Sequence, residues 1–376
     1  MAILTRCDNC DNRMNLDDKY AGLLIRCLRC KEKVRVPDRP QQVDVDDSRP
    51  PPRRRRKRKQ ASNSNALWIG IGAGAAVIMI VVVVVAIAVK KSSNKLDNFS
   101  AGSNETVNPA TFPELSPASV LQPSVMFQSA VFNPGAIPMK VWFYRPGQAT
   151  GKLPLVLVPP AGSTLVAGMD LGDGDRAEHI PYVKAGFAVG SFEIDGAAPK
   201  TQNVSDKAIL QGARSFRDAK AGLKNAKAAL DFLLAKANDI DENRIFIAGH
   251  SSAATLALLM AEHEPRIKGC AAYCAVTDVE KWLGKAIPPL NRAIPGYRDF
   301  IRFSSPKTHV ANLKCPVFLF HARDDTNVPV SQTTAFAELL KKTNPDVTVD
   351  TSATGDHYDS MINAGIPRGI AWMQKR

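Results

Sequence analysis

The chain has 376 residues, of which 45% are hydrophobic and 23% charged, and its formal net charge is +13. This composition excludes a chain that is disordered throughout, and the length suffices for two or three domains. Residues 1–60 hold 17 Lys and Arg against 9 Asp and Glu. The basic character therefore belongs to the N-terminal end and says little about the substrate of the remainder.

Four of the seven cysteines lie in residues 1–37, as the pairs Cys7-x2-Cys10 and Cys27-x2-Cys30. Two such pairs can place four thiolates around one tetrahedral Zn²⁺, and a segment this short needs a metal because it cannot bury a core of its own. The segment resembles the small N-terminal zinc ribbons of many bacterial membrane proteins. Two disulfides, or cysteines without a role, are the alternative that we do not favour.

Residues 38–65 are rich in Pro, Asp, Ser and Arg and lack an apolar period, which predicts a disordered linker. Within it, residues 53–59 form an unbroken basic run. Such a run is typical of nucleic-acid or anionic-lipid binding when it stands alone. Its position directly before an apolar segment favours a role in membrane topology, and nucleic-acid binding is the minority interpretation.

Residues 66–89 contain no charged side chain. As a helix, this segment is long enough to span the ~30 Å hydrocarbon core of a bilayer. Seven basic residues precede it and only two lysines follow it directly. The positive-inside rule then predicts a cytoplasmic N-terminus and a C-terminal part outside the cytoplasmic membrane, in a bacterial periplasm-like compartment. A reducing cytoplasm also favours zinc over disulfides for the N-terminal cysteines.

Residues 90–117 read as a Ser-, Asn- and Pro-rich tether, and residues 118–376 as one large α/β domain. Short apolar runs alternate with helical periods there, which predicts a mostly parallel sheet flanked by helices. An amphipathic helix is expected between residues 215 and 236, and a connection over about 279–313 is long enough for a small cap over a site. The expected strands are residues 136–144, 155–158, 185–192, 245–248, 267–273, 316–320 and 346–350.

The most informative motif is Gly249-His250-Ser251-Ser252-Ala253, which lies between an apolar run and a helix-like stretch. A strand, a sharp turn and a helix in this order form a nucleophile elbow, where small residues at 249 and 253 avoid collisions. Asp325 and His357 follow in the chain order Ser, Asp, His. We therefore predict a serine hydrolase in which Ser251 attacks an acyl carbonyl, His357 is its base, and Asp325 orients the imidazole.

Each predicted role has a rival nearby. Asp324 competes with Asp325, but the frame D-x-x-V-P starts at Asp325 and favours it. Ser252 is displaced by one from the motif, and its backbone N–H is instead expected to donate to the oxyanion. The second donor should follow the strand at 155–158; prolines lack N–H, so it comes from Ala161, Gly162 or Ser163, of which we select Gly162 and Ser163.

From about Leu153 to Arg376, the chain resembles the catalytic domains of prolyl oligopeptidase-like and dienelactone-hydrolase-like enzymes of the α/β-hydrolase superfamily. The resemblance rests on residues 249–253, on His321-Ala-Arg-Asp-Asp-Thr-Asn-Val-Pro329 and on Gly355-Asp-His-Tyr-Asp359. It implies an acyl-enzyme intermediate and a small-molecule ester or peptide substrate. Ala253 and Ala322 replace the usual glycines, dienelactone hydrolases proper have cysteine where this chain has Ser251, and no segment suggests the oligopeptidase β-propeller. The resemblance therefore supports the chemistry more than a peptide substrate.

The other chemistry-bearing residues have plainer interpretations. His250 is expected to line the pocket and His321 to be packed, and the histidines at 179, 263 and 309 to be structural or on the surface. Cys270 and Cys274 are expected to be buried free thiols, with a disulfide as the alternative. No metal cluster appears in residues 118–376, so no cofactor is expected for catalysis. The competing hypothesis is a non-catalytic sensor or scaffold, coupled to a cytoplasmic partner through the zinc ribbon.

Overall fold

The computed structural model describes residues 2–6, 13–17, 24–26, 33–36, 109–135, 137–198 and 204–376. The chain divides into two units, Met1–Gly72 and Ala73–Arg376, which are described separately. Several predictions lie outside the described residues: the four cysteines of the zinc site, the linker 38–65, the apolar segment 66–89 and most of the tether. Within the described ranges, no helix is both long enough and apolar enough to cross a membrane.

The first unit contains two antiparallel hairpins. Strand β1 (Ala2–Arg6) pairs with β2 (Arg13–Asp17), and β3 (Leu24–Arg26) pairs with β4 (Lys33–Arg35). In the sequence, one Cys-x2-Cys pair falls between the strands of each hairpin.

The second unit is built on one nine-stranded sheet with the order β13-β12-β11-β10-β8-β9-β7-β6-β5. Six strands, from β13 to β9 in this order, run parallel, and β7, β6 and β5 add an antiparallel edge. The sheet is therefore mixed: the predicted parallel part reaches from the edge strand β13 to β9, and the antiparallel strands lie at the other edge. Its strands are β5 (Ser119–Gln122), β6 (Val125–Phe132), β7 (Met139–Pro146), β8 (Leu153–Leu157), β9 (Ala188–Phe192), β10 (Ile240–His250), β11 (Gly269–Tyr273), β12 (Val317–Ala322) and β13 (Val347–Ser352).

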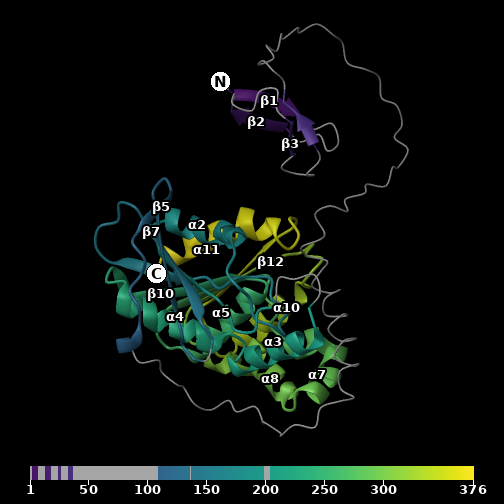
Figure 1. Ribbon diagram of the computed structural model, residues 1–376. Coiled ribbons are helices and arrows are strands. Elements are labelled where there is room, and N and C mark those ends of the chain that lie inside the picture. The colour runs from purple at the N-terminus through teal and green to yellow at the C-terminus, as the bar shows by residue number, and fades with distance from the viewer. Residues whose placement is uncertain are drawn as a thin grey trace. The chain divides into compact units, whose positions relative to one another are not determined.

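Helices cover both faces of this sheet (Figure 1). Helices α2 (Arg176–Lys184) and α11 (Ile366–Met373) pack on one face. The other face carries α4 (Leu223–Lys236), α5 (Ser252–His263) and α10 (Ser331–Leu340), together with α3 (Asp206–Asp218). Successive side chains of a strand point to opposite faces of the sheet: Ile245 and Ile247 of β10 pack in one core, and Phe246 in the other. This two-residue alternation buries the central strands on both sides, as parallel sheets require.

The predicted helix over 215–236 is wrong as one element, because it is two helices. α3 ends at Asp218, and Lys220, Ala221 and Gly222 all have positive φ angles before α4 begins. A Cβ on Gly222 would lie 2.9 Å from side-chain carbons of Ile194 and Leu256. The break thus lets the chain pass close to the core.

The long connection over 279–313 folds into four short helices: α6 (Val279–Leu283), α7 (Ile287–Ala293), α8 (Tyr297–Phe303) and α9 (Pro306–His309). The buried Tyr297 hydroxyl donates to the carbonyl of Val166, 3.2 Å away in the loop after β8. Phe300 meets Phe216 of α3 edge to face at 5.8 Å. These contacts fix the connection next to the loop that was expected to supply an oxyanion donor.

The folded domain begins before the predicted residue 118. Phe112 is buried, and its ring contacts those of Phe132 and Phe232, with centroids 5.2 and 5.5 Å away. The last residues of the predicted tether are therefore part of the hydrophobic core.

Candidate active site

Ser251 occupies a sharp turn between β10 and α5. Its φ and ψ of 56° and −119° lie in a region that non-glycine residues rarely adopt. A Cβ at Gly249 would come within 2.5 Å of the main-chain carbon and oxygen of Ala253, so the turn requires glycine there. The Ser251 N–H donates to the carbonyl of Tyr273 at 2.9 Å. The strand, turn and helix predicted for the nucleophile elbow are therefore present.

Asp325 and His357 lie on the loops after β12 and β13, at the same carboxyl edge of the sheet as Ser251. Nδ1 of His357 donates to Oδ2 of Asp325 over 2.7 Å, and the Asp325 side chain is fully buried. The other oxygen, Oδ1, accepts the backbone N–H groups of Asn327 and Val328 at 2.9 and 2.8 Å. The frame that favoured Asp325 thus contains two of its hydrogen-bond donors.

The rival Asp324 has a different partner. Its carboxylate accepts the N–H groups of Gly355 and Asp356, at 3.2 and 2.9 Å. The side chain of Asp356 in turn accepts from the backbone and hydroxyl of Thr326. Asp324 therefore connects the loop of His357 to the loop of Asp325, and of these two acids it is Asp325 that contacts the imidazole of His357.

The hydrogen bond to Asp325 determines the protonation of His357. Because the carboxylate accepts from Nδ1, that nitrogen carries the proton, and Nε2 of the neutral ring keeps its lone pair. Burial lowers the pKa of His357 below its ordinary value, and the neighbouring His250 and His321 act in the same direction, whereas Asp325 opposes them. His357 is thus a neutral base near pH 7.

The Asp325 carboxylate remains ionised although it is buried. Burial alone would raise the pKa of Asp325, but hydrogen bonds from His321 and His357 outweigh burial and hold this pKa far below its ordinary value. An ionised acid and a neutral, correctly oriented imidazole are what a triad needs before it reacts.

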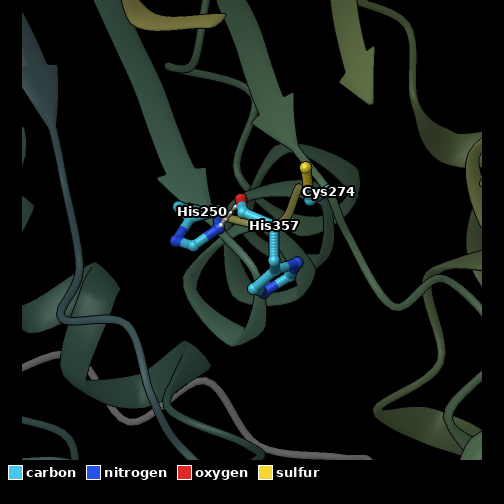
Figure 2. A group of neighbouring side chains, drawn as sticks. All are labelled: His250, Cys274 and His357. Atoms are coloured by element: carbon cyan, nitrogen blue, oxygen red, sulfur yellow. Dashed lines mark hydrogen bonds between the residues drawn. The ribbon is translucent and has the colours of Figure 1, made fainter. Parts of the chain in front are cut away.

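The bond between nucleophile and base is not formed. Nε2 of His357 is buried without a hydrogen-bond partner among the described residues. The two loops are nevertheless adjacent, because Nε2 of His250, the residue before Ser251, lies 3.0 Å from the carbonyl oxygen of His357 (Figure 2). The two imidazole rings have centroids only 4.5 Å apart. Hydrogen bonds between catalytic groups are often long in free enzymes and tighten when substrate binds.

The loop after β8 approaches the first turn of α5. The N–H of Ser163 donates to the Ser252 hydroxyl at 2.9 Å, so this predicted oxyanion donor already has a partner. Gly162 has a φ of +96°, in the left-handed region that favours glycine. Because the Ser163 N–H is already engaged, Gly162 stays the predicted oxyanion donor of this loop. The Ser252 N–H lies at the N-terminus of α5, where the helix dipole favours negative charge.

Three further side chains, His250, Cys274 and His321, lie near Asp325 and His357. His250 and Cys274 are neighbours of His357 (Figure 2), and the potential metal-ligating atoms of these three residues lie within 4.8 Å of one another. Because hydrogen bonds already engage one ring nitrogen of each histidine, we treat the group as part of the active site. His321, predicted to be packed, contacts Asp325 directly: its Nε2 lies 3.1 Å from Oδ2. In the sequence, the one signal for this contact is that His321 and Asp325 belong to the same motif.

The remaining predictions concern two cysteines and three histidines. Cys270 and Cys274 are buried free thiols, as expected. His179 is buried against the Tyr144 hydroxyl at 3.3 Å, and His263 and His309 bond to backbone carbonyls. These three histidines are structural.

The family model of the prolyl oligopeptidase family matches residues 210–375. No curated protein matches the chain significantly. Three solved structures are similar in fold. An acylaminoacyl peptidase from Pyrococcus horikoshii has 15% identity and a TM-score of 0.50, and the match covers 68% of this chain and 41% of that one. A putative dienelactone hydrolase from Klebsiella pneumoniae has 17% identity and a TM-score of 0.51, covering 67% of this chain and 99% of that one, and acetyl xylan esterase 1 from Thermoanaerobacterium has 16% identity and a TM-score of 0.51, covering 70% and 87% of the two chains.

At these identities the similarity establishes the fold, which is that of the α/β-hydrolases. The chain spans about two fifths of the length of the acylaminoacyl peptidase. Together with the family match, the fold supports a serine hydrolase.

Proposed function

We propose that residues 109–376 cleave an ester or amide bond through a triad of Ser251, His357 and Asp325. The observation that carries the proposal is the buried 2.7 Å contact between Asp325 and His357, on loops adjacent to a strained serine at the end of β10. Strain of this kind persists only where the surrounding structure imposes it, and it exposes the serine hydroxyl at the carboxyl edge of the sheet.

The proposed reaction has two halves. A side-chain rotation brings the Ser251 hydroxyl to Nε2 of His357, which takes its proton as the oxygen attacks the acyl carbonyl. The backbone N–H groups of Ser252 and Gly162 stabilise the resulting oxyanion, each contributing ~3 kcal/mol. His357 then gives the proton to the leaving group, and water cleaves the acyl-enzyme by the reverse order of proton transfers.

Hydrolysis of chromogenic esters by the full chain tests this proposal. Ser251→Ala should lower kcat/KM by at least ~10³-fold. Ser119→Ala is the matched control, because Ser119 is exposed on strand β5 at the edge of the sheet, and it should leave turnover unchanged. The unformed bond between Ser251 and His357 also fits the alternative of a non-catalytic sensor, which predicts ligand-dependent stabilisation without turnover in any of these proteins.

The acyl and leaving groups need a separate experiment. The family match and the esterase and peptidase neighbours support small esters or peptides as the substrate class. Rates measured on a series of esters with graded acyl length, and on aminopeptidase substrates, distinguish an esterase from a peptidase. We expect ester cleavage to be the faster activity.

We also propose that residues 66–89 anchor the chain in the cytoplasmic membrane, with the hydrolase domain outside. The uncharged length and the basic run before it support this topology. Protease added to intact spheroplasts should digest the C-terminal domain and spare an N-terminal fragment. Protection of the whole chain would contradict the proposed orientation.

Finally, we propose that the cysteine pairs of residues 7–30 bind one structural Zn²⁺, which is not used in catalysis. Two Cys-x2-Cys pairs, each between the strands of a hairpin, support this. The purified chain should contain one zinc per molecule, and Cys7→Ser should lose it while Cys315→Ser retains it. Equal zinc content in the two variants would contradict the assignment. A cytoplasmic partner for this segment remains part of the proposal.

A further inference from the structure

The Asp325 carboxylate contacts two histidines. Oδ2 receives Nδ1 of His357 at 2.7 Å and Nε2 of His321 at 3.1 Å. His321 is fully buried at the end of β12, four residues before Asp325. The proposed reaction does not use it.

The tautomer of His321 follows from its partners. Nε2 lies 2.8 Å from the carbonyl oxygen of Val328 and 3.1 Å from the Asp325 carboxylate. Both are acceptors, so Nε2 must carry a proton. Nδ1 lies 2.7 Å from the hydroxyl of Thr333 on α10, which therefore donates to it when the ring is neutral. The Nε2–H of His321 is therefore shared between the Val328 carbonyl, which is the nearer acceptor, and the Asp325 carboxylate, and Thr333 fixes the proton on that nitrogen.

We propose that His321 is a positioning residue, which holds Asp325 and withdraws part of the negative charge that would otherwise favour protonation of His357. This inference rests on the proposed function. A carboxylate oxygen that already accepts one hydrogen bond is a weaker acceptor for a second. The base therefore stays neutral to lower pH, and Asp325 is held by a second contact besides that with His357.

Titratable groups from several elements surround His357. His357 faces His250 from β10, Asp325 and His321 from β12 and its loop, and Cys274 from the segment after β11. Glu178 of α2 approaches through His250, with 3.7 Å between Oε1 and Nδ1. Burial lowers the pKa of His357 most, and His250 and His321 lower it further, against the raising effect of Asp325. Removing the His321 donor alone should raise this pKa.

The test measures the pKa of His357 in the full chain by ¹H–¹⁵N spectra of histidine-labelled protein, a readout that needs no turnover. His321→Leu should raise it, because the carboxylate loses one of its two histidine contacts. His321→Gln should stay near the wild type, because its amide can donate to Asp325 and accept from Thr333. The acid limb of kcat/KM should move to higher pH in His321→Leu only.

If His321→Leu does not fold, a second pair of variants tests the role of His321 through its partner Thr333. Thr333→Val removes the donor to Nδ1 and should raise the pKa of His357 by a smaller amount, whereas Thr333→Ser keeps the hydroxyl and should not. An unchanged pKa in folded His321→Leu, or equal values for Thr333→Val and Thr333→Ser, would overturn the inference. Wild-type protein without turnover would instead refute the proposed function, because the pKa shift is measured independently.

Discussion

Substituting Gly249 with alanine tests the elbow geometry most sharply. The added Cβ would lie 2.5 Å from the backbone of Ala253, whereas ordinary van der Waals contacts begin at 3.4 Å. The strand and helix must therefore separate by up to about 0.9 Å, the difference between the two distances. Because both clashing atoms belong to the backbone, no side-chain rotation can relieve the contact.

A displacement of this size has two measurable consequences. Overpacking of a close contact costs about 1–3 kcal/mol of stability, and misplacing a reacting group by ~1 Å can reduce the rate ~10²-fold. Gly249→Ala should show both, by urea unfolding and by kcat/KM on a chromogenic ester. Gly174→Ala is the control, because a Cβ there would have no atom within 4 Å. If Gly249→Ala matched the control in both assays, the reasoning about the turn would be refuted.

Four other outcomes follow from the structure. The lowered pKa of His357 places the acid limb of kcat/KM below about pH 6.5, and a midpoint above 7 would contradict its burial. Asp325→Asn should lower kcat by about 10⁴-fold, and Asp324→Asn much less, because the Asp324 carboxylate bonds to the backbone N–H groups of Gly355 and Asp356 and not to His357. Burial raises the pKa of Glu262, whose carboxyl oxygens lack partners within the described part of the chain. The free energy of unfolding is therefore highest below pH 4.5, where Glu262 is protonated in both states, and it falls by up to about 1.4 kcal/mol per pH unit as the pH rises toward the folded-state pKa. Glu262→Gln should flatten this dependence in unfolding energies measured from pH 5 to 8. Parallel pH dependence of the two proteins would refute that assignment. Phe112→Ala should destabilise the domain by about 3–5 kcal/mol in urea unfolding. An effect below about 0.5 kcal/mol would mean that Phe112 is not part of the folded core.

The sequence predicted the elements whose physical causes are local. An apolar run, a glycine and a small residue four positions later predict the turn at Ser251, because sterics allow little else there. The frame after β12 selected Asp325 over Asp324, and the structure shows the reason: the backbone N–H groups of Asn327 and Val328 bond to Asp325. The alternation of strands and helices similarly predicted the parallel part of the sheet.

Features that depend on packing between distant segments were missed. The break between α3 and α4 uses positive φ angles at Lys220 and Ala221, two residues with no intrinsic preference for them. The antiparallel strands β5 and β6 carry exposed apolar residues such as Val120 and Val131, so no buried run identifies them. The contact of His321 with Asp325 also escaped prediction, because a histidine at the end of an apolar strand is equally typical of a packed core.

The central claim is that the Ser251 hydroxyl is the activated nucleophile, and covalent trapping tests it most directly. The full chain would be treated with a fluorophosphonate, digested and mapped by mass spectrometry. We predict one adduct per chain, on Ser251, that is lost when His357 is replaced by alanine. A chain that stays unmodified, or an adduct on any other residue, would contradict the assignment.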